Sequence, residues 1–218
     1  MNIYANGITL HYTVEGTGAP LLLVHGNGEN LHIFDEAVSV LKDHFTCYAL
    51  DSRGHGESSP VAEYHYRDMA DDVIAFLDAL DLTDVTYYGF SDGGIVGLLA
   101  APQTPRISRL IVSGANVSPA GAVLWLRVLF RLQTLFRKNP LVTLMQTEPD
   151  ISDEWLSGIR VPTLVLAGEH DLIRESETRH IARMIPGSAL KILPGEGHGS
   201  YIVHSTKIAD EILAFCRR

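Results

Sequence analysis

The sequence has little cysteine and no excess of basic residues, and each shortage argues against a class of protein. Only Cys47 and Cys216 occur in 218 residues, which is too few for a disulfide framework, and their spacing fits no metal site. Acidic residues outnumber Lys and Arg, and the formal net charge is −9. Nucleic acids and anionic lipid surfaces attract clustered Lys and Arg, so this charge argues against such partners. We expect reduced, buried thiols and no nucleic-acid partner.

A leader segment and long apolar runs are lacking as well. Residues 1–6 have neither the basic stretch nor the apolar core of a signal peptide. The most lipid-like run, at 122–136, is interrupted by Arg127 and Arg131 and is too short to span a bilayer. We therefore expect a cytoplasmic protein with no integral membrane association.

Strand and helix signals alternate along the chain. The apolar fraction of 46% and the charged fraction of 20% are ordinary for a globular protein, and the length suits one α/β domain, 1–218. The segments at 3–5 and 8–14 flank Asn6-Gly7, a pair typical of a tight hairpin turn. Alternating strands and helices then predict a mostly parallel sheet with helices on both faces. The other predicted strands are 20–24, 45–50, 85–88, 107–112, 161–167 and 190–193.

Residues 116–158 break this alternation, because they contain no strand signal. An amphipathic run lies at 123–136, and we interpret the segment as a short cap inserted into the domain. A crossover helix with a long loop is the alternative. Leu124 and Val128, on the apolar face of the run, are expected to line a substrate pocket. The cap is also a candidate surface for a homodimer.

The segment Gly89-Phe90-Ser91-Asp92-Gly93 stands between a predicted strand and a predicted helix. This is the G-x-S-x-G pattern in the context that a nucleophile elbow requires. A serine on so sharp a turn projects its hydroxyl beyond the sheet, and the flanking glycines let strand and helix pass close together. Glycines that merely end a strand are the alternative. We predict Ser91 as nucleophile and Phe90 as a pocket residue.

A second glycine-rich loop, H-G-N-G at 25–28, follows the predicted strand at 20–24. Acyl transfer places negative charge on a carbonyl oxygen, and fixed N–H donors stabilise that charge. We predict that the amides of Asn27 and Asp92 are these donors, and that Asn27 also contacts substrate. A plain tight turn is the alternative.

The loop G-E-H-D at 168–171 offers a carboxylate that can orient a catalytic histidine. It follows a predicted strand and therefore lies at the edge of the sheet where ligands bind. The preceding strand end, 113–116, contains no acid. We favour Asp171 as the orienting acid over Glu169 and over the acids of the cap.

The loop G-E-G-H-G at 195–199 follows the last predicted strand and carries His198, the predicted general base. Ser91, Asp171 and His198 then occur in the chain order expected of such a site. This position distinguishes His198 among the ten histidines. The alternatives for the base are His25, His55, His170 and His204.

Together these motifs resemble those of the α/β-hydrolase family over nearly the whole chain. The segment D-S-R-G-H-G-E-S at 51–58 is similar to D-x-R-G-x-G-x-S in lipase-like and esterase-like members, where it is mainly structural. The resemblance implies a serine hydrolase that cleaves a small carboxylic ester or similar acyl compound through an acyl-enzyme. Its triad would be Ser91, His198 and Asp171, with no cofactor and no metal. The cap is short for this family, which disfavours a large specificity domain.

Other functions stay open. The same residues could serve a thioesterase, lactonase, perhydrolase or lyase, and a non-catalytic ligand-binding relative would keep the fold. Asp92 raises a separate question, since most elbows have an uncharged residue after the serine. It could cap backbone amides or pair with a basic group such as Arg53. It could instead meet a cationic group on the substrate, as the similar Ser-Asp elbow of the amino-acid-ester hydrolases related to biphenyl hydrolase suggests.

Overall fold

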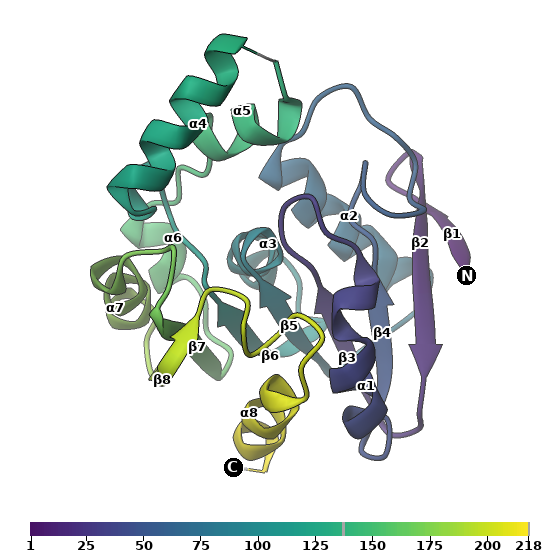
Figure 1. Cartoon of the computed structure of the whole chain (residues 1–218). Coiled ribbons are helices and arrows are strands. Elements are labelled where there is room, and N and C mark those ends of the chain that lie inside the picture. Colours follow the sequence, from purple (N-terminus) through teal and green to yellow (C-terminus); the bar gives the residue numbers. More distant parts are fainter. Residues whose placement is uncertain (137, 218) are drawn as a thin grey trace.

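The computed structural model describes residues 1–136 and 138–217. An eight-stranded sheet of order β1-β2-β4-β3-β5-β6-β7-β8 runs through the molecule (Figure 1). Its strands are β1 (Asn2–Ala5), β2 (Ile8–Glu15), β3 (Ala19–Val24), β4 (Phe45–Leu50), β5 (Val85–Phe90), β6 (Ile107–Ser113), β7 (Thr163–His170) and β8 (Ala189–Gly197). The pairs β1–β2 and β2–β4 are antiparallel and all later pairs are parallel. The predicted fold class is confirmed, including the N-terminal hairpin.

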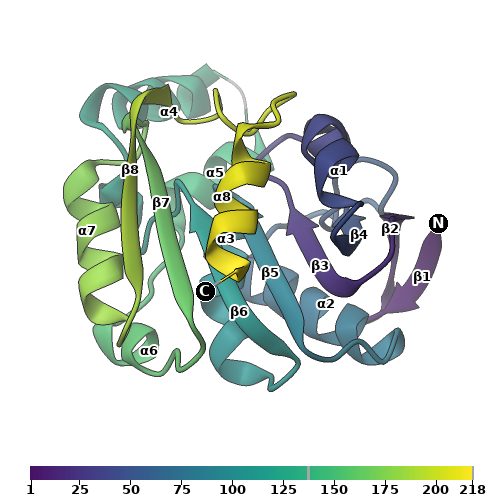
Figure 2. The ribbon, with the colours of Figure 1, turned by 90° about the horizontal axis from the view of Figure 1, so that it is seen from below.

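Helices cover both faces of this sheet. The α-helices are α1 (Asp35–Leu41), α2 (Tyr66–Ala79), α3 (Asp92–Ala100), α4 (Leu124–Phe136), α5 (Pro140–Thr147), α6 (Asp153–Ser157), α7 (Glu175–Met184) and α8 (Lys207–Cys216). Short 3-10 turns lie at Leu31–Phe34, Ala101–Gln103 and Pro119–Gly121. One buried apolar cluster joins the sheet to α2, α3 and α7, and a second joins it to α1 and α8. Figure 2 shows α8 in front of the sheet.

The strand β3 shows why the central runs of the sequence are apolar throughout. Leu21 and Leu23 belong to the cluster on the α1 and α8 side, whereas Leu22 and Val24 belong to the other cluster. Successive side chains of a strand point to opposite faces, so a strand covered on both faces needs an apolar residue at each position. The carboxyl end of β3 is therefore held rigidly next to that of β5, with which it pairs in parallel.

The helices α4, α5 and α6 come from the segment between β6 and β7. Figure 1 shows α4 at the outer end of the molecule with α5 beside it. Val123 donates its amide to the Leu172 carbonyl, and Arg174 donates to the Gly121 carbonyl, each at 2.9 Å. The start of α4 is thereby tied to the loop after β7. In the residues that the structure describes, no helix is both long enough and apolar enough to cross a bilayer.

Candidate functional site

Ser91 stands on a sharp turn between β5 and α3. Its φ is 52° and its ψ is −113°, a strained conformation for a residue with a side chain. A Cβ on Gly89 would collide with the carbonyl of Gly93, and a Cβ on Gly93 would collide with that of Val24. The Ser91 amide donates to the Ser113 carbonyl at 2.8 Å, which fixes the turn to β6. The close passage of strand and helix thus requires both glycines.

The side chains of Ser91, His198 and Asp171 lie in a row. His198 Nε2 is 3.1 Å from Ser91 Oγ, and His198 Nδ1 is 2.6 Å from Asp171 Oδ1. The Asp171 side chain is 3% exposed and also accepts the amides of Ile173 at 2.9 Å and Gly168 at 3.2 Å. An acceptor held in this way keeps the proton on Nδ1 and leaves Nε2 to accept from the hydroxyl. The structure therefore brings together three residues from three strand ends.

The competing acids bind elsewhere. Glu169 accepts the amide of Gly195 at 2.7 Å on the exposed side of the loop. Asp153, the first residue of α6, lies 2.7 Å from Nε2 of His180. Neither side chain contacts the row that contains Ser91.

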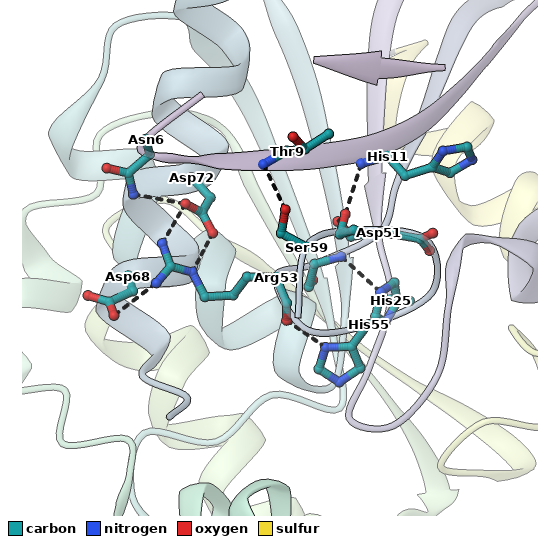
Figure 3. Close-up of polar contacts among 12 residues, drawn as sticks. Asn6, Thr9, His11, His25, Asp51, Arg53, His55, Ser59, Asp68 and Asp72 are labelled. Atoms are coloured by element: carbon teal, nitrogen blue, oxygen red, sulfur yellow. Dashed lines mark hydrogen bonds and ion pairs between the residues drawn. The ribbon is translucent and has the colours of Figure 1, made fainter. Parts of the chain in front are cut away.

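Two of the alternative histidines hold the loop after β3 in place. His25 Nε2 accepts the amide of Ser52 at 3.1 Å, and His55 Nε2 accepts the amide of Gly28 at 3.1 Å. Their ring centroids are 5.1 Å apart (Figure 3). Burial lowers the pKa of His25 to about 4, so this ring is neutral near pH 7. The loop after β4 thus supports the predicted oxyanion loop.

Arg53 is fully engaged with carboxylates of α2. Its guanidinium donates to both oxygens of Asp72, at 2.6 and 2.7 Å, and to Asp68 at 3.0 Å (Figure 3). Asn6 donates to Asp72 as well, at 2.8 Å. The pairing of Asp92 with Arg53, one of the alternatives raised for Asp92, is not observed, because the carboxylate of Asp72 occupies the Nε–Nη2 edge of the guanidinium.

The Asp92 carboxylate turns inward beside the nucleophile. The residue is 6% exposed, and its two oxygens accept from Tyr66 Oη at 2.8 Å and from Asn27 Nδ2 at 2.9 Å. Burial raises the pKa of Asp92, and the two hydrogen bonds oppose that rise. Tyr66 is a partner that the sequence did not suggest, because it opens a helix 26 positions away.

A cavity of about 250 Å³ opens over Ser91. Its apolar lining is Phe90, Pro119, Ala122, Leu126, Phe130, Met145, Leu172 and Ile173. Leu124 and Val128 are instead 70% and 45% exposed and do not line this cavity, contrary to the expectation from the sequence. The helix α4 is apolar around most of its circumference, and its pattern alone does not fix which side faces inward. Leu126 and Phe130 occupy the inner side.

Three acidic residues are among the polar residues that line this cavity. They are Glu29, Asp92 and Glu148, and no Lys or Arg is among the described residues around the cavity. Glu29 accepts the amide of Gly26 at 3.0 Å, and burial raises the pKa of its carboxyl. Sequence reasoning missed Glu29 and Glu148. The only available signal was the position of Glu29 in the loop that begins H-G-N-G.

Gly114, at the end of β6, leaves room for the imidazole. Its φ is +61°, and a Cβ there would lie 2.7 Å from Cε1 and 2.9 Å from Nδ1 of His198. The same Cβ would be 3.6 Å from Asp171 Oδ2. Sequence reasoning considered this strand end only for its lack of an acid and missed the steric role of the glycine.

Comparisons with known proteins agree with this architecture. A family model described as alpha/beta hydrolase fold matches residues 19–150. Human serine hydrolase BPHL is 30% identical over an alignment 245 positions long, gaps included, which covers 96% of this chain and 82% of that protein. The 3-oxoadipate enol-lactonase 2 of Acinetobacter baylyi is 30% identical over an alignment 179 positions long, gaps included, which covers 79% of this chain and 64% of that protein.

A solved structure, an enol-lactonase from Burkholderia xenovorans, has a TM-score of 0.83 to this chain at 22% identity. The comparison covers the full length of both chains, so the whole fold is shared. The family match spans more than half of the sequence and includes the segment around Ser91. This chain therefore belongs to the α/β-hydrolase fold family.

Proposed function

We propose that the protein is a serine hydrolase that cleaves a small carboxylic ester, or a similar acyl compound, through an acyl-enzyme. The observation that carries this proposal is the row of contacts from Ser91 Oγ through His198 to the buried carboxylate of Asp171. His198 accepts the serine proton while Oγ attacks the substrate carbonyl carbon, and Asp171 stabilises the imidazolium. The proton then passes to the leaving alcohol, and water attacks the acyl-enzyme by the same route to release the acid.

The amides of Asn27 and Asp92 are the proposed donors to the oxyanion. Asp92 is the first residue of α3, where backbone amides have no acceptor within the helix. Both residues line the cavity that contains Ser91. The Asp92 carboxylate accepts two hydrogen bonds within the protein, and these compensate part of the repulsion between its charge and a developing oxyanion.

The volume and the lining of the cavity favour a small substrate that is uncharged or cationic. Its volume of about 250 Å³ is below the range typical of sites for drug-sized ligands, and most of its wall is apolar. Glu29 and Glu148 disfavour an anionic acyl group by like-charge repulsion. An ester of a short, neutral acid satisfies both constraints.

An ester that carries an ammonium group is the second candidate, favoured by the carboxylates of Glu29, Asp92 and Glu148 in the cavity. It predicts that an amino-acid ester is hydrolysed faster than its uncharged analogue. Asp92→Asn should then reduce the preference, because only Glu29 and Glu148 keep their charge, and should leave neutral esters nearly unaffected. Equal rates on both esters in the wild type would exclude this candidate.

A fluorophosphonate probe tests the proposed chemistry directly. Wild-type protein should be labelled at Ser91, as mapped by peptide mass spectrometry, and folded Ser91→Ala should not be labelled. Ser113→Ala, which changes a buried serine near the elbow, serves as the matched control and should still react. Absence of labelling in folded wild type would favour a non-catalytic ligand-binding relative. Labelling without ester turnover would favour thioesters, lactones or another use of the triad, which the same assay panel can include.

A further inference from the structure

The outer face of α4 is apolar and uncovered. Seven large apolar side chains of this helix are at least 45% exposed, namely Leu124, Trp125, Val128, Leu129, Leu132, Leu135 and Phe136. Elsewhere in the described residues, only Met1 and Tyr4 are large apolar residues with comparable exposure. At 3.6 residues per turn the seven positions fall within one arc of roughly 140°. An apolar patch concentrated on one element indicates a surface that binds something.

The first part of the cap, 116–147, which contains α4 and α5, has a formal charge opposite to that of the whole chain. Residues 116–147 contain four basic residues and no Asp or Glu, whereas the formal net charge of the protein is −9. The four are Arg127, Arg131, Arg137 and Lys138. By helical periodicity Arg127 and Arg131 lie along one edge of the apolar arc. The net charge of the protein therefore does not describe the surface of α4, because the four acidic residues of the cap all lie in its second part, 148–158.

We propose that α4 docks the protein onto an anionic lipid surface. The helix would lie in the plane of the headgroups, with its outer face among the acyl chains and Arg127 and Arg131 at the phosphates. Interfacial helices combine these same features, an aromatic and leucine-rich face bordered by basic residues. The inner side chains Leu126 and Phe130 line the cavity over Ser91. Docking would therefore bring the cavity to within about one helix diameter, ~10 Å, of the lipid.

A second copy of the chain fits this face less well. A helix of 13 residues is only about 20 Å long and ~10 Å wide. It alone covers much less than the roughly 800 Å² per partner of a standard stable interface. Two such faces in contact would also bring arginines of like charge together. The homodimer predicted from the sequence thus becomes the competing outcome of the test.

Binding to lipid vesicles tests the proposal without reference to hydrolysis. The protein should cosediment with vesicles of equal parts phosphatidylglycerol and phosphatidylcholine, and much less with pure phosphatidylcholine, and salt should weaken the binding. Trp125 offers a local probe, since Trp155, the other tryptophan, is only partly exposed and donates to the Leu98 carbonyl at 3.1 Å. In a Trp155→Phe background the Trp125 emission should shift to the blue on binding.

Paired variants separate the two contributions. Arg127→Gln with Arg131→Gln should weaken partitioning by roughly 20- to 30-fold, at about fivefold per charge near an anionic surface. Leu132→Gln with Phe136→Gln should weaken it more than about 10-fold by removing apolar contact. The matched control, Lys42→Gln with Lys191→Gln, removes two charges outside the cap and should bind like the wild type. Circular dichroism and thermal melts confirm that each variant is folded.

The results that would refute lipid docking can be distinguished from one another. If a monomeric protein does not bind the anionic vesicles, or if the arginine variant binds as well as the wild type, the proposal is refuted. It is also refuted if light scattering finds a stable dimer that Leu132→Gln with Phe136→Gln converts to a monomer without any vesicle binding. Ser91→Ala should bind vesicles normally, so loss of the proposed hydrolase activity would leave this result unaffected.

Discussion

Replacing Gly114 by alanine tests whether the space beneath the imidazole controls the chemistry. The added Cβ would lie 2.7 Å from His198 Cε1, whereas ordinary contact begins at 3.4 Å. The ring therefore has to move by about 0.7 Å, away from the position in which Nε2 is 3.1 Å from Ser91 Oγ. A misplacement near 1 Å costs on the order of 10²-fold in rate. We expect kcat/KM to fall by about 30- to 100-fold.

The backbone strain of this substitution has a matched control. Gly187 also has a positive φ, +72°, but a Cβ there would have nothing within 4 Å. Alanine in the left-handed region costs about 1 kcal/mol at either position, which corresponds to a fall in Tm of about 2–4 °C for a chain of this size. Gly187→Ala should therefore lose stability and keep its activity. Only Gly114→Ala should lose both.

Three measurements check this reasoning. The first is kcat/KM for a p-nitrophenyl ester, and the second is the rate at which a fluorophosphonate labels Ser91. The third is the proton NMR signal of His198 Nδ1–H, which reports the bond to Asp171 without any substrate. If Gly114→Ala keeps more than half of the wild-type kcat/KM, or if Gly187→Ala loses as much activity, the steric argument is refuted.

Three further predictions follow from the same site. Asp171→Asn should lower turnover on the order of 10⁴-fold because it loses the acceptor that orients His198, whereas Glu169→Gln should cost less than about tenfold, as steady-state kinetics would show. The reverse ranking would transfer the orienting role to Glu169. Because burial lowers the pKa of His25 to about 4, only the unfolded chain binds this proton between pH 6.5 and 4. The free energy of unfolding should therefore fall on the order of 3 kcal/mol as pH drops through that window, and urea titrations of the wild type and of His25→Gln should differ in this slope. Tyr66→Phe removes one of two donors to the buried Asp92 carboxylate and should cost about 1.5–3 kcal/mol of stability at pH 7. The loss should shrink at acidic pH, where the carboxyl is protonated, and a loss independent of pH would contradict this account.

The fold could be predicted because burial in a sheet imposes a recognisable apolar pattern on the sequence of each strand. A strand buried on both faces is apolar at nearly every position, as β3 is over 21–24 and as β5 is apart from the buried Thr86. Ser91, Asp171 and His198 could be located for a related reason, since parallel strands bring their carboxyl ends to one edge of the sheet. Short motifs at strand ends are therefore informative even when more than 100 positions separate them, as with Ser91 and His198.

Contacts between side chains of elements that are distant in the sequence could not be predicted in the same way. The carboxylate of Asp92 finds Tyr66 on another helix, and Gly114 is required by an imidazole from a distant loop. Neither contact produces a periodic pattern in the sequence, because each depends on how two elements are placed relative to one another in space. The partner of Arg53 shows the same limit, since Asp72 lies 19 positions away on α2.

The prediction that Leu124 and Val128 of α4 line the pocket failed for a different reason, and that reason is also relevant to the proposed lipid docking. A helix that buries one face in a cap has a polar outer side, and its stripe then identifies the inner residues. In α4 the inner Leu126 and Phe130 and the outer Leu129 and Leu132 are all apolar, so the pattern contains no such information. If the outer side of α4 faced only water, polar residues would be expected there instead of leucine. A helix in contact with a cavity on one side and with lipid on the other has a reason to be apolar on both. The feature that misled the sequence interpretation is therefore the one that the vesicle experiment examines.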